Sequence, residues 1–192
     1  MKLYGTTTSP FVRRIKVIAS ELGEPVEMID TMPEEGQALL RAVSPIRKVP
    51  VADLGDRILF DSRAIADWLF AKRGYGPFAP PRDVLQEANL LNAIDAATDS
   101  VIQLFYLRRD GVAAGGSVYE KRQLERTDAI FAWLGEQLAP RAGAFGFPEL
   151  AVCCTLDWMD FRQSYPTERA GKADVRARFR DRPSLVATYP KL

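Results

Sequence analysis

The sequence predicts an α/β domain with a small mixed sheet, followed by a domain built of helices alone. Three observations predict this division. Short apolar runs alternate with helical patterns through the first 73 residues. A stretch rich in glycine and proline then follows at residues 74–81. Beyond it, apolar residues recur at helical spacing and no segment has the pattern of a strand.

The elements of the first domain can be placed in order from apolar runs and turn residues. Strands are predicted near residues 2–4 and 26–29, with helices over residues 10–22 and 34–42. Residues 51–54 and 58–60 flank a Gly-Asp turn, which predicts a hairpin, and a last helix begins at Asp61-Ser62. Strands joined by a helix and followed by an antiparallel pair predict a mixed four-stranded sheet covered by helices, as in a thioredoxin-like domain.

The second domain is expected to be an all-α helical bundle. Glycine and proline residues at 111–116 and 140–148 separate its long helices. The apolar positions that mark two of these helices are Leu90, Ile94, Ala97, Val101 and Leu104, then Leu124, Phe131, Leu134 and Leu138. The expected limits are 1–73 for the first domain, 74–82 for a linker and 83–192 for the helical domain.

Composition excludes several classes of function. The 192 residues carry a net charge of +1 and contain no histidine. No run of five like charges favours nucleic acid or acidic lipid, so we expect a small molecule or another protein as partner. No apolar stretch approaches the roughly 18 residues that span a bilayer, and no signal pattern opens the chain, so a cytoplasmic protein is expected.

The two cysteines, Cys153 and Cys154, are adjacent and lie among apolar residues. Adjacent helical cysteines cannot reach disulfide geometry, so both are interpreted as buried core residues. Without histidine or a Cys-x-x-Cys spacing, we expect no metal site. Histidine-based acid or base catalysis is excluded.

The first candidate site is the start of the first helix. Ser9 is predicted to be its N-cap and Pro10 its first residue. The free N–H groups of that helical turn then favour an anion beside the Ser9 hydroxyl. An ordinary helix cap is the alternative interpretation of Ser9 taken alone.

Three ordered segments resemble one family. Ser9-Pro10-Phe11 follows the first strand, Lys48-Val49-Pro50 precedes the hairpin, and Asp61-Ser62 begins the next helix. In this order and spacing they resemble the N-terminal domain of cytosolic glutathione transferases, of the bacterial type with serine at the thiol-facing position. The run at residues 179–184, with later Thr188 and Pro190, resembles the end of that family's helical domain.

The resemblance implies a site for glutathione as co-substrate. Ser9 would be the catalytic residue, donating its hydroxyl to the glutathione thiolate and lowering the thiol pKa. Thr6, Thr7 and Thr8 are alternatives, with Thr8 the strongest of them. The tripeptide would be bound by Lys48, Val49, Pro50, Asp61 and Ser62. A cis Val49-Pro50 bond would turn the Val49 backbone toward the cysteinyl part of glutathione.

The resemblance also implies a pocket for a small electrophile at the cleft between the domains. Its candidates are Phe11, Phe105, Tyr106 and Arg109, although Phe105 is also interpreted as core. The expected enzyme is a homodimeric glutathione transferase whose electrophile cannot be inferred from the sequence. A non-catalytic binding protein of the same fold is the alternative. A glutathione-dependent thiol reductase is less favoured because it needs a cysteine where Ser9 stands.

Two positions depart from the family's pattern. Arg47 stands before Lys48, where the family usually has a small residue. Gly146, with Glu149 three residues on, stands where the family usually has a Ser or Thr cap followed by Asp. Half of a capping box is thereby kept, so the sequence predicts that Gly146→Ser stabilises the protein by a few tenths of a kcal/mol.

Overall fold

The computed structural model describes residues 1–141 and 143–191, which form two compact units. The first unit comprises Met1–Phe78 together with the C-terminal segment that starts at Arg180. The second comprises Ala79–Phe179. The division at residue 78 lies within the segment expected to be a linker. The first unit is built around a sheet, and the second is built of helices.

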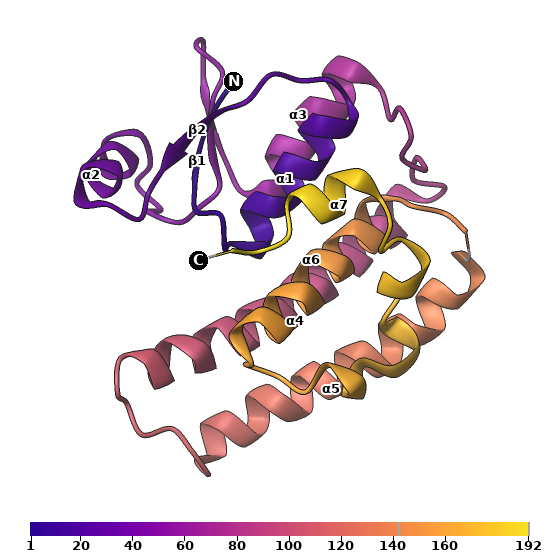
Figure 1. Cartoon of the computed structure of the whole chain (residues 1–192). Helices are drawn as coiled ribbons and strands as arrows, with labels where there is room; N and C mark the ends of the chain where they lie inside the picture. Colours follow the sequence, from indigo (N-terminus) through magenta and orange to yellow (C-terminus); the bar gives the residue numbers. More distant parts are fainter. Residues whose placement is uncertain (142, 192) are drawn as a thin grey trace. The chain divides into compact units, whose positions relative to one another are not determined.

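The first unit contains a four-stranded mixed sheet, which confirms the predicted fold class (Figure 1). Its strand order is β2-β1-β3-β4. The parallel pair is β1 (Lys2–Gly5) and β2 (Glu27–Asp30), which α1 (Pro10–Glu21) connects. The hairpin of β3 (Val51–Asp53) and β4 (Ile58–Phe60) adds antiparallel to β1.

Helices cover the two faces of this sheet. On one face, α2 (Glu34–Val43) packs Leu40 against Tyr4 and Val51. Since strand side chains alternate between faces, the neighbouring Leu3 and Ala52 point to the other face, where α1 and α3 (Ser62–Arg73) pack together. The sheet is therefore buried on both sides, and its strand ends are the places left for a ligand.

The first helix is more deeply buried than its apolar spacing predicts. Ile15 and Ile18 are fully buried, as expected, but Arg13 and Arg14 are buried too. The Arg13 guanidinium donates to the carbonyl oxygen of Leu185 at 2.9 Å. That residue lies in α7 (Pro183–Ala187), which packs on α1.

A second contact holds the same C-terminal segment against α1. Arg182 donates to both carboxylate oxygens of Glu21, at 2.6 and 2.8 Å. The segment that the sequence places at the end of the helical domain thus packs with the first unit. The physical reason is that two arginine contacts, Arg13 with Leu185 and Arg182 with Glu21, join α1 to this segment.

The second unit is helical throughout, as predicted. Its long helices are α4 (Val84–Arg109), α5 (Val118–Leu138) and α6 (Phe147–Arg162), with α4 packed on both others. One short 3-10 helix, η1 (Ala139–Arg141), lies between α5 and α6, and two more, η2 (Thr167–Ala173) and η3 (Arg176–Arg178), follow α6. In α6, Cys153 and Cys154 are buried and are not joined by a disulfide, as expected. Within the described residues, no helix has the length and apolar character needed to cross a membrane.

The first turn of α6 is capped by the carboxylate of Glu149, which also pairs with Arg141, and not by a hydroxyl. The Glu149 carboxylate accepts from the N–H of Gly146 at 2.9 Å, which confirms the half capping box. Arg141 donates to the same carboxylate at 2.6 and 3.2 Å. A Cβ added at Gly146 would lie 3.0 Å from Arg141 Nη2, 3.1 Å from Glu149 Oε2 and 3.2 Å from the Ala79 carbonyl oxygen.

This crowding opposes the stabilisation that the sequence predicts for Gly146→Ser. The added hydroxyl offers a cap, but its Cβ would press on both members of the Arg141–Glu149 pair and on the Ala79 carbonyl oxygen, which must yield by a few tenths of an ångström. We predict that Gly146→Ser lowers the free energy of unfolding by about 1–2 kcal/mol in urea denaturation. Gly115→Ser is the control, because nothing lies within 4 Å of its added Cβ. Equal stability of the two variants would contradict the crowding argument.

A buried carboxylate anchors the end of α3 to the turn after α1. The Glu24 side chain is 4% exposed and accepts from Lys72 Nζ at 2.8 Å and Arg73 Nε at 2.9 Å. Burial by itself would raise the pKa of Glu24, but these two hydrogen bonds outweigh it and lower the pKa below 4.5.

A lowered pKa means that Glu24 contributes stability above pH 4.5 and loses it as the pH falls through the folded-state pKa. We predict that Glu24→Gln lowers the free energy of unfolding by about 1–3 kcal/mol at pH 7. The difference from the wild type should shrink as the pH is lowered below 4.5. Glu34→Gln, which removes an exposed pair with Arg41, should change stability by less than about 1 kcal/mol. A pH-independent loss in Glu24→Gln would contradict the ion-pair account.

Candidate functional site

Three loops meet at one end of the sheet because of the strand register. Tyr4 pairs with Val51, and Val51 pairs with Phe60, so these residues form a row across β1, β3 and β4. The chain leaves or enters each strand just beyond this row, at residues 6–9, 48–50 and 61–62. With neighbouring strands about 4.8 Å apart, the row spans about 10 Å. The three sequence motifs therefore lie at the same end of the sheet.

Ser9 is the N-cap of α1, as predicted. It has an extended backbone, and its Oγ accepts from the N–H of Val12 at 3.3 Å. Pro10 follows as the first helical residue. Ser9 is half-buried, and among the described residues its hydroxyl accepts a hydrogen bond but donates none. Its proton is therefore available to an anion at the helix N-terminus.

The neighbouring threonines are engaged differently. The Thr6 and Thr8 hydroxyl oxygens lie 3.4 Å apart and share a hydrogen bond. Thr7 is exposed and donates to the carbonyl oxygen of Lys191 at 3.3 Å. Of these four hydroxyls, that of Ser9 caps a helix and donates no hydrogen bond among the described residues.

The segment before β3 contains the expected cis bond between Val49 and Pro50. Val49 is half-buried and packs at the edge of the cluster around Tyr4. Among the described residues, the backbone N–H and C=O of Val49 form no hydrogen bond. They present a short stretch of strand edge to which an extended peptide could add. Lys48, next to it, is exposed.

The entry to α3 has an unusual backbone and a buried serine. Asp61 has a φ of 80°, and its Oδ1 accepts from the N–H of Arg63 at 2.7 Å. Such a conformation is costly for a residue other than glycine and is commonest at functional sites. Ser62 is 2% exposed, and its side chain forms no hydrogen bond among the described residues, although its hydroxyl oxygen is not fully buried. An unused hydroxyl at a helix N-terminus is suited to a carboxylate.

Asp67, a charged residue near this entry, is not among the site residues that the sequence predicts. Asp67 lies one helical turn beyond Arg63 on α3. Burial raises the pKa of Asp67, and the negative charge of Asp61 adds to this, while Arg63 opposes it. The i,i+4 spacing of Arg63 and Asp67 is the signal that could have drawn attention to it.

The four expected electrophile-pocket residues are divided between the units. Phe11 lies in the first unit, with the Arg14 guanidinium 4.6 Å from its ring centroid. In the second unit, Phe105 is half-buried against Trp158, with ring centroids 5.7 Å apart. Tyr106 is 48% exposed.

Arg109, the fourth of these residues, stacks on Tyr106 and pairs with Asp110 at 2.7 Å. The hydrogen bond that Arg109 donates to Asp110 raises the pKa of Arg109, which keeps its charge. A pocket shared by the four residues remains a prediction.

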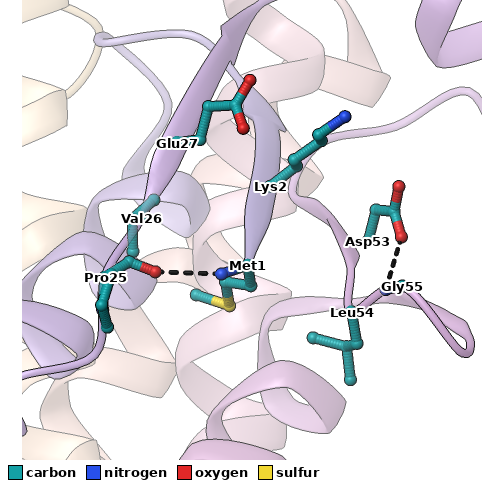
Figure 2. A pocket seen from close by; sticks show the side chains of 8 residues that line it. All are labelled: Met1, Lys2, Pro25, Val26, Glu27, Asp53, Leu54 and Gly55. Atoms are coloured by element: carbon teal, nitrogen blue, oxygen red, sulfur yellow. Dashed lines mark hydrogen bonds between the residues drawn. The ribbon is translucent and has the colours of Figure 1, made fainter.

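A shallow hollow of about 560 Å³ lies at the opposite end of the sheet (Figure 2). Lys2 pairs there with Glu27 on one side and with Asp53 on the other, so the hollow lies at the start of β1. The bonds in it, from the Met1 amino group to the Pro25 carbonyl oxygen and from the Gly55 N–H to Asp53, are structural. It contains none of the residues that the sequence motifs single out.

Comparisons with known proteins agree with the fold of the first unit. Residues 3–80 match the family model described as "Glutathione S-transferase, N-terminal domain". The uncharacterized GST-like protein YibF of Escherichia coli is 26% identical over 174 residues, covering 86% of this chain and 85% of that protein. Glutathione S-transferase 4 of Zea mays is 38% identical over 77 residues, 34% of its length.

Solved structures show the same fold. A glutathione S-transferase from Methylobacterium radiotolerans, in complex with glutathione sulfonate, aligns with a TM-score of 0.83 at 24% identity, covering 100% of this chain and 95% of that one. A glutathione transferase family member from Pseudomonas fluorescens Pf-5, with bound glutathione, aligns with a TM-score of 0.78 at 25% identity, covering 100% and 99%.

Proposed function

We propose that this chain, a member of the glutathione transferase family, binds glutathione at the end of the sheet where its three motifs meet and conjugates it to a small electrophile. Support comes from the uncommitted hydrogen-bonding groups of these motifs and from the glutathione bound in structural relatives. Homodimer formation and a cytoplasmic location stay predictions.

The size of the candidate site suits a tripeptide. Three extended residues span about 10 Å, which matches the row from Tyr4 across Val51 to Phe60. One end of the ligand would lie at Asp61 and Ser62, and its middle would lie beside Val49. The thiol would then point toward the N-terminus of α1, where Ser9 lies.

The observation that carries the proposal is the buried Ser62 without a hydrogen-bond partner among the described residues. The Ser62 hydroxyl still reaches solvent at the start of α3, so a ligand can supply an acceptor for its unused O–H there. The γ-glutamyl carboxylate supplies such an acceptor. The free N–H groups of the first turn of α3 add to the attraction.

The backbone of Val49 would hold the cysteinyl residue. Its N–H and C=O are not used within the described residues, and pairing with an extended peptide would satisfy both. Two hydrogen bonds in strand geometry also fix the direction of the ligand. They would hold the thiol in place without contacting the sulfur.

The chemistry would then depend on the state of the thiol. The Ser9 hydroxyl would donate to the sulfur and, with the N-terminus of α1, favour the thiolate. Lowering a thiol pKa from about 8.5 to about 6.5 needs roughly 2.7 kcal/mol, within the range of one charge-assisted hydrogen bond plus a helix dipole. The thiol proton would leave to water, and the sulfur lone pair would form the new bond to carbon while a leaving group departs with its electron pair.

We predict that Ser9→Ala raises the pKa of bound glutathione toward its free value and slows conjugation at pH 7 by about 10- to 100-fold. Affinity for glutathione should stay within about 2-fold, because Val49 and Ser62 hold the tripeptide. The measurements are thiolate absorbance titrated against pH, calorimetric titration with glutathione, and rates with a panel of electrophiles.

Two variants serve as controls. Ser62→Ala should show the opposite signature, with an affinity loss of roughly 1–3 kcal/mol and an unchanged thiol pKa. Thr8→Ala should change neither quantity. Superimposable pH titrations for the wild type and Ser9→Ala would transfer the role to Thr8 or the backbone. Glutathione binding without conjugation of any electrophile would favour a non-catalytic binding protein.

A further inference from the structure

The C-terminal segment of the first unit has contacts at both ends of α1. Arg182 binds Glu21, the last residue of that helix. Arg13, near the start of the helix, binds Leu185 and Thr188. Figure 1 shows α7, which belongs to this segment, beside α1. Part of the segment belongs to the C-terminal motif found in the sequence, and the proposed binding of glutathione leaves that motif without a role.

Arg13 joins this segment to the helical turn that Ser9 caps. Its backbone N–H donates to the Ser9 carbonyl oxygen at 3.0 Å, which closes that turn. The residue is 2% exposed, and its guanidinium donates to the Leu185 carbonyl oxygen at 2.9 Å and to Thr188 Oγ1 at 3.3 Å. The same group lies 5.5 Å from the centroid of the Tyr189 ring. Because a buried charged group loses much by giving up a hydrogen bond, Arg13 fixes the turn against the segment.

A second contact reaches the loop on the other side of Ser9. The Thr7 hydroxyl donates to the carbonyl oxygen of Lys191 at 3.3 Å, so the segment contacts the chain both before and after Ser9. The local bonds of Ser9 are long by comparison with the usual N–H···O distance of about 2.9 to 3.0 Å. Its N–H donates to the Thr6 carbonyl oxygen at 3.3 Å, and its Oγ accepts from the Val12 N–H at 3.3 Å. The position of Ser9 therefore depends on contacts from outside its own loop.

We propose that Arg13 is a positioning residue, which binds the C-terminal segment at Leu185 and Thr188 and thereby holds the Ser9 hydroxyl where it meets the sulfur of glutathione. The inference rests on the proposed function. Arg13 acts through Ser9, since its guanidinium is engaged by the segment and its backbone closes the turn that Ser9 caps. Because a misplacement of about 1 Å can slow a reaction by about 100-fold, even a small shift of this turn is measurable.

The first test compares Arg13→Met with the wild type, because methionine keeps much of the buried apolar volume and donates no hydrogen bond. Arg13→Met should raise the pKa of bound glutathione by about 0.5 to 1 and slow conjugation at pH 7 by about 2- to 10-fold. Affinity for glutathione should stay within about 2-fold, because Val49 and Ser62 hold the tripeptide. The measurements are thiolate absorbance titrated against pH, conjugation rates and calorimetric titration. Arg13→Lys, which can still donate to the Leu185 carbonyl oxygen, should recover part of the rate.

Thr188→Val tests the same contact with a smaller change. It removes the oxygen that accepts from Arg13 Nε and leaves the Leu185 contact in place. The thiol pKa should rise in this variant too, but by less than in Arg13→Met. If Arg13→Met fails to fold, Thr188→Val decides the question alone.

A double variant separates positioning from a direct effect of the Arg13 charge on the sulfur. In a Ser9→Ala background, Arg13→Met should leave the thiol pKa unchanged, because its whole effect passes through the Ser9 hydroxyl. A direct electrostatic effect would persist in that background.

Arg182→Gln is the matched control for a general loss of stability. It removes two hydrogen bonds, at 2.6 and 2.8 Å, that join the same segment to α1. Its partner Glu21 lies twelve positions beyond Ser9, about 18 Å along the helix. Arg182→Gln and Arg13→Met should both lower Tm, whereas only Arg13→Met should change the thiol pKa.

The outcomes distinguish the inference from the proposed function. If the wild type binds glutathione but Arg13→Met and Thr188→Val leave the thiol pKa unchanged, the role of Arg13 alone is overturned. An equal rise of the thiol pKa in Arg182→Gln also overturns it, since loosening of α1 as a whole would then be responsible. A further rise caused by Arg13→Met in the Ser9→Ala background overturns it as well. A wild type that does not bind glutathione overturns the proposed function and this inference together.

Discussion

The antiparallel pairing of β3 with β1 is the constraint on which the rest of the structure depends. It places Val51 between Tyr4 and Phe60 and so brings the loops that follow or precede these residues to one end of the sheet. The same pairing packs Val51 and Tyr4 against Leu40 of α2. A shift of one residue would turn Val51 out of this core and move Val49 away from the helix N-termini. Core and candidate site thus share one register.

Much of this could be predicted from the sequence because the signals are local. The Ser9-Pro10 cap, the hairpin turn before Ile58 and the helix entry at Asp61 each depend on neighbouring residues, and the structure contains all three. The cis Val49-Pro50 bond, which only the resemblance to the glutathione transferase family implies, is also present. The roles of these residues toward a ligand stay predictions.

Other features could not be predicted because they depend on distant contacts. The C-terminal segment packs with the first unit through Arg182 and Glu21, which are 161 positions apart. The crowding around Gly146 comes from Arg141 and the Ala79 carbonyl oxygen, which no local pattern places there. The left-handed backbone of Arg47 contradicts the ordinary preference of its residue type. In the first two cases tertiary contacts outweigh local propensity.

The central claim is that one end of the sheet binds glutathione through backbone groups that the protein itself leaves unused. Residue-resolved amide hydrogen exchange, with and without millimolar glutathione, tests it most directly. The account predicts slower exchange at the Val49 and Ser62 amides, with no change at Leu54 and Gly55 at the opposite end. Protection confined to that opposite end, or unchanged exchange at both Val49 and Ser62 when glutathione is bound, would contradict it.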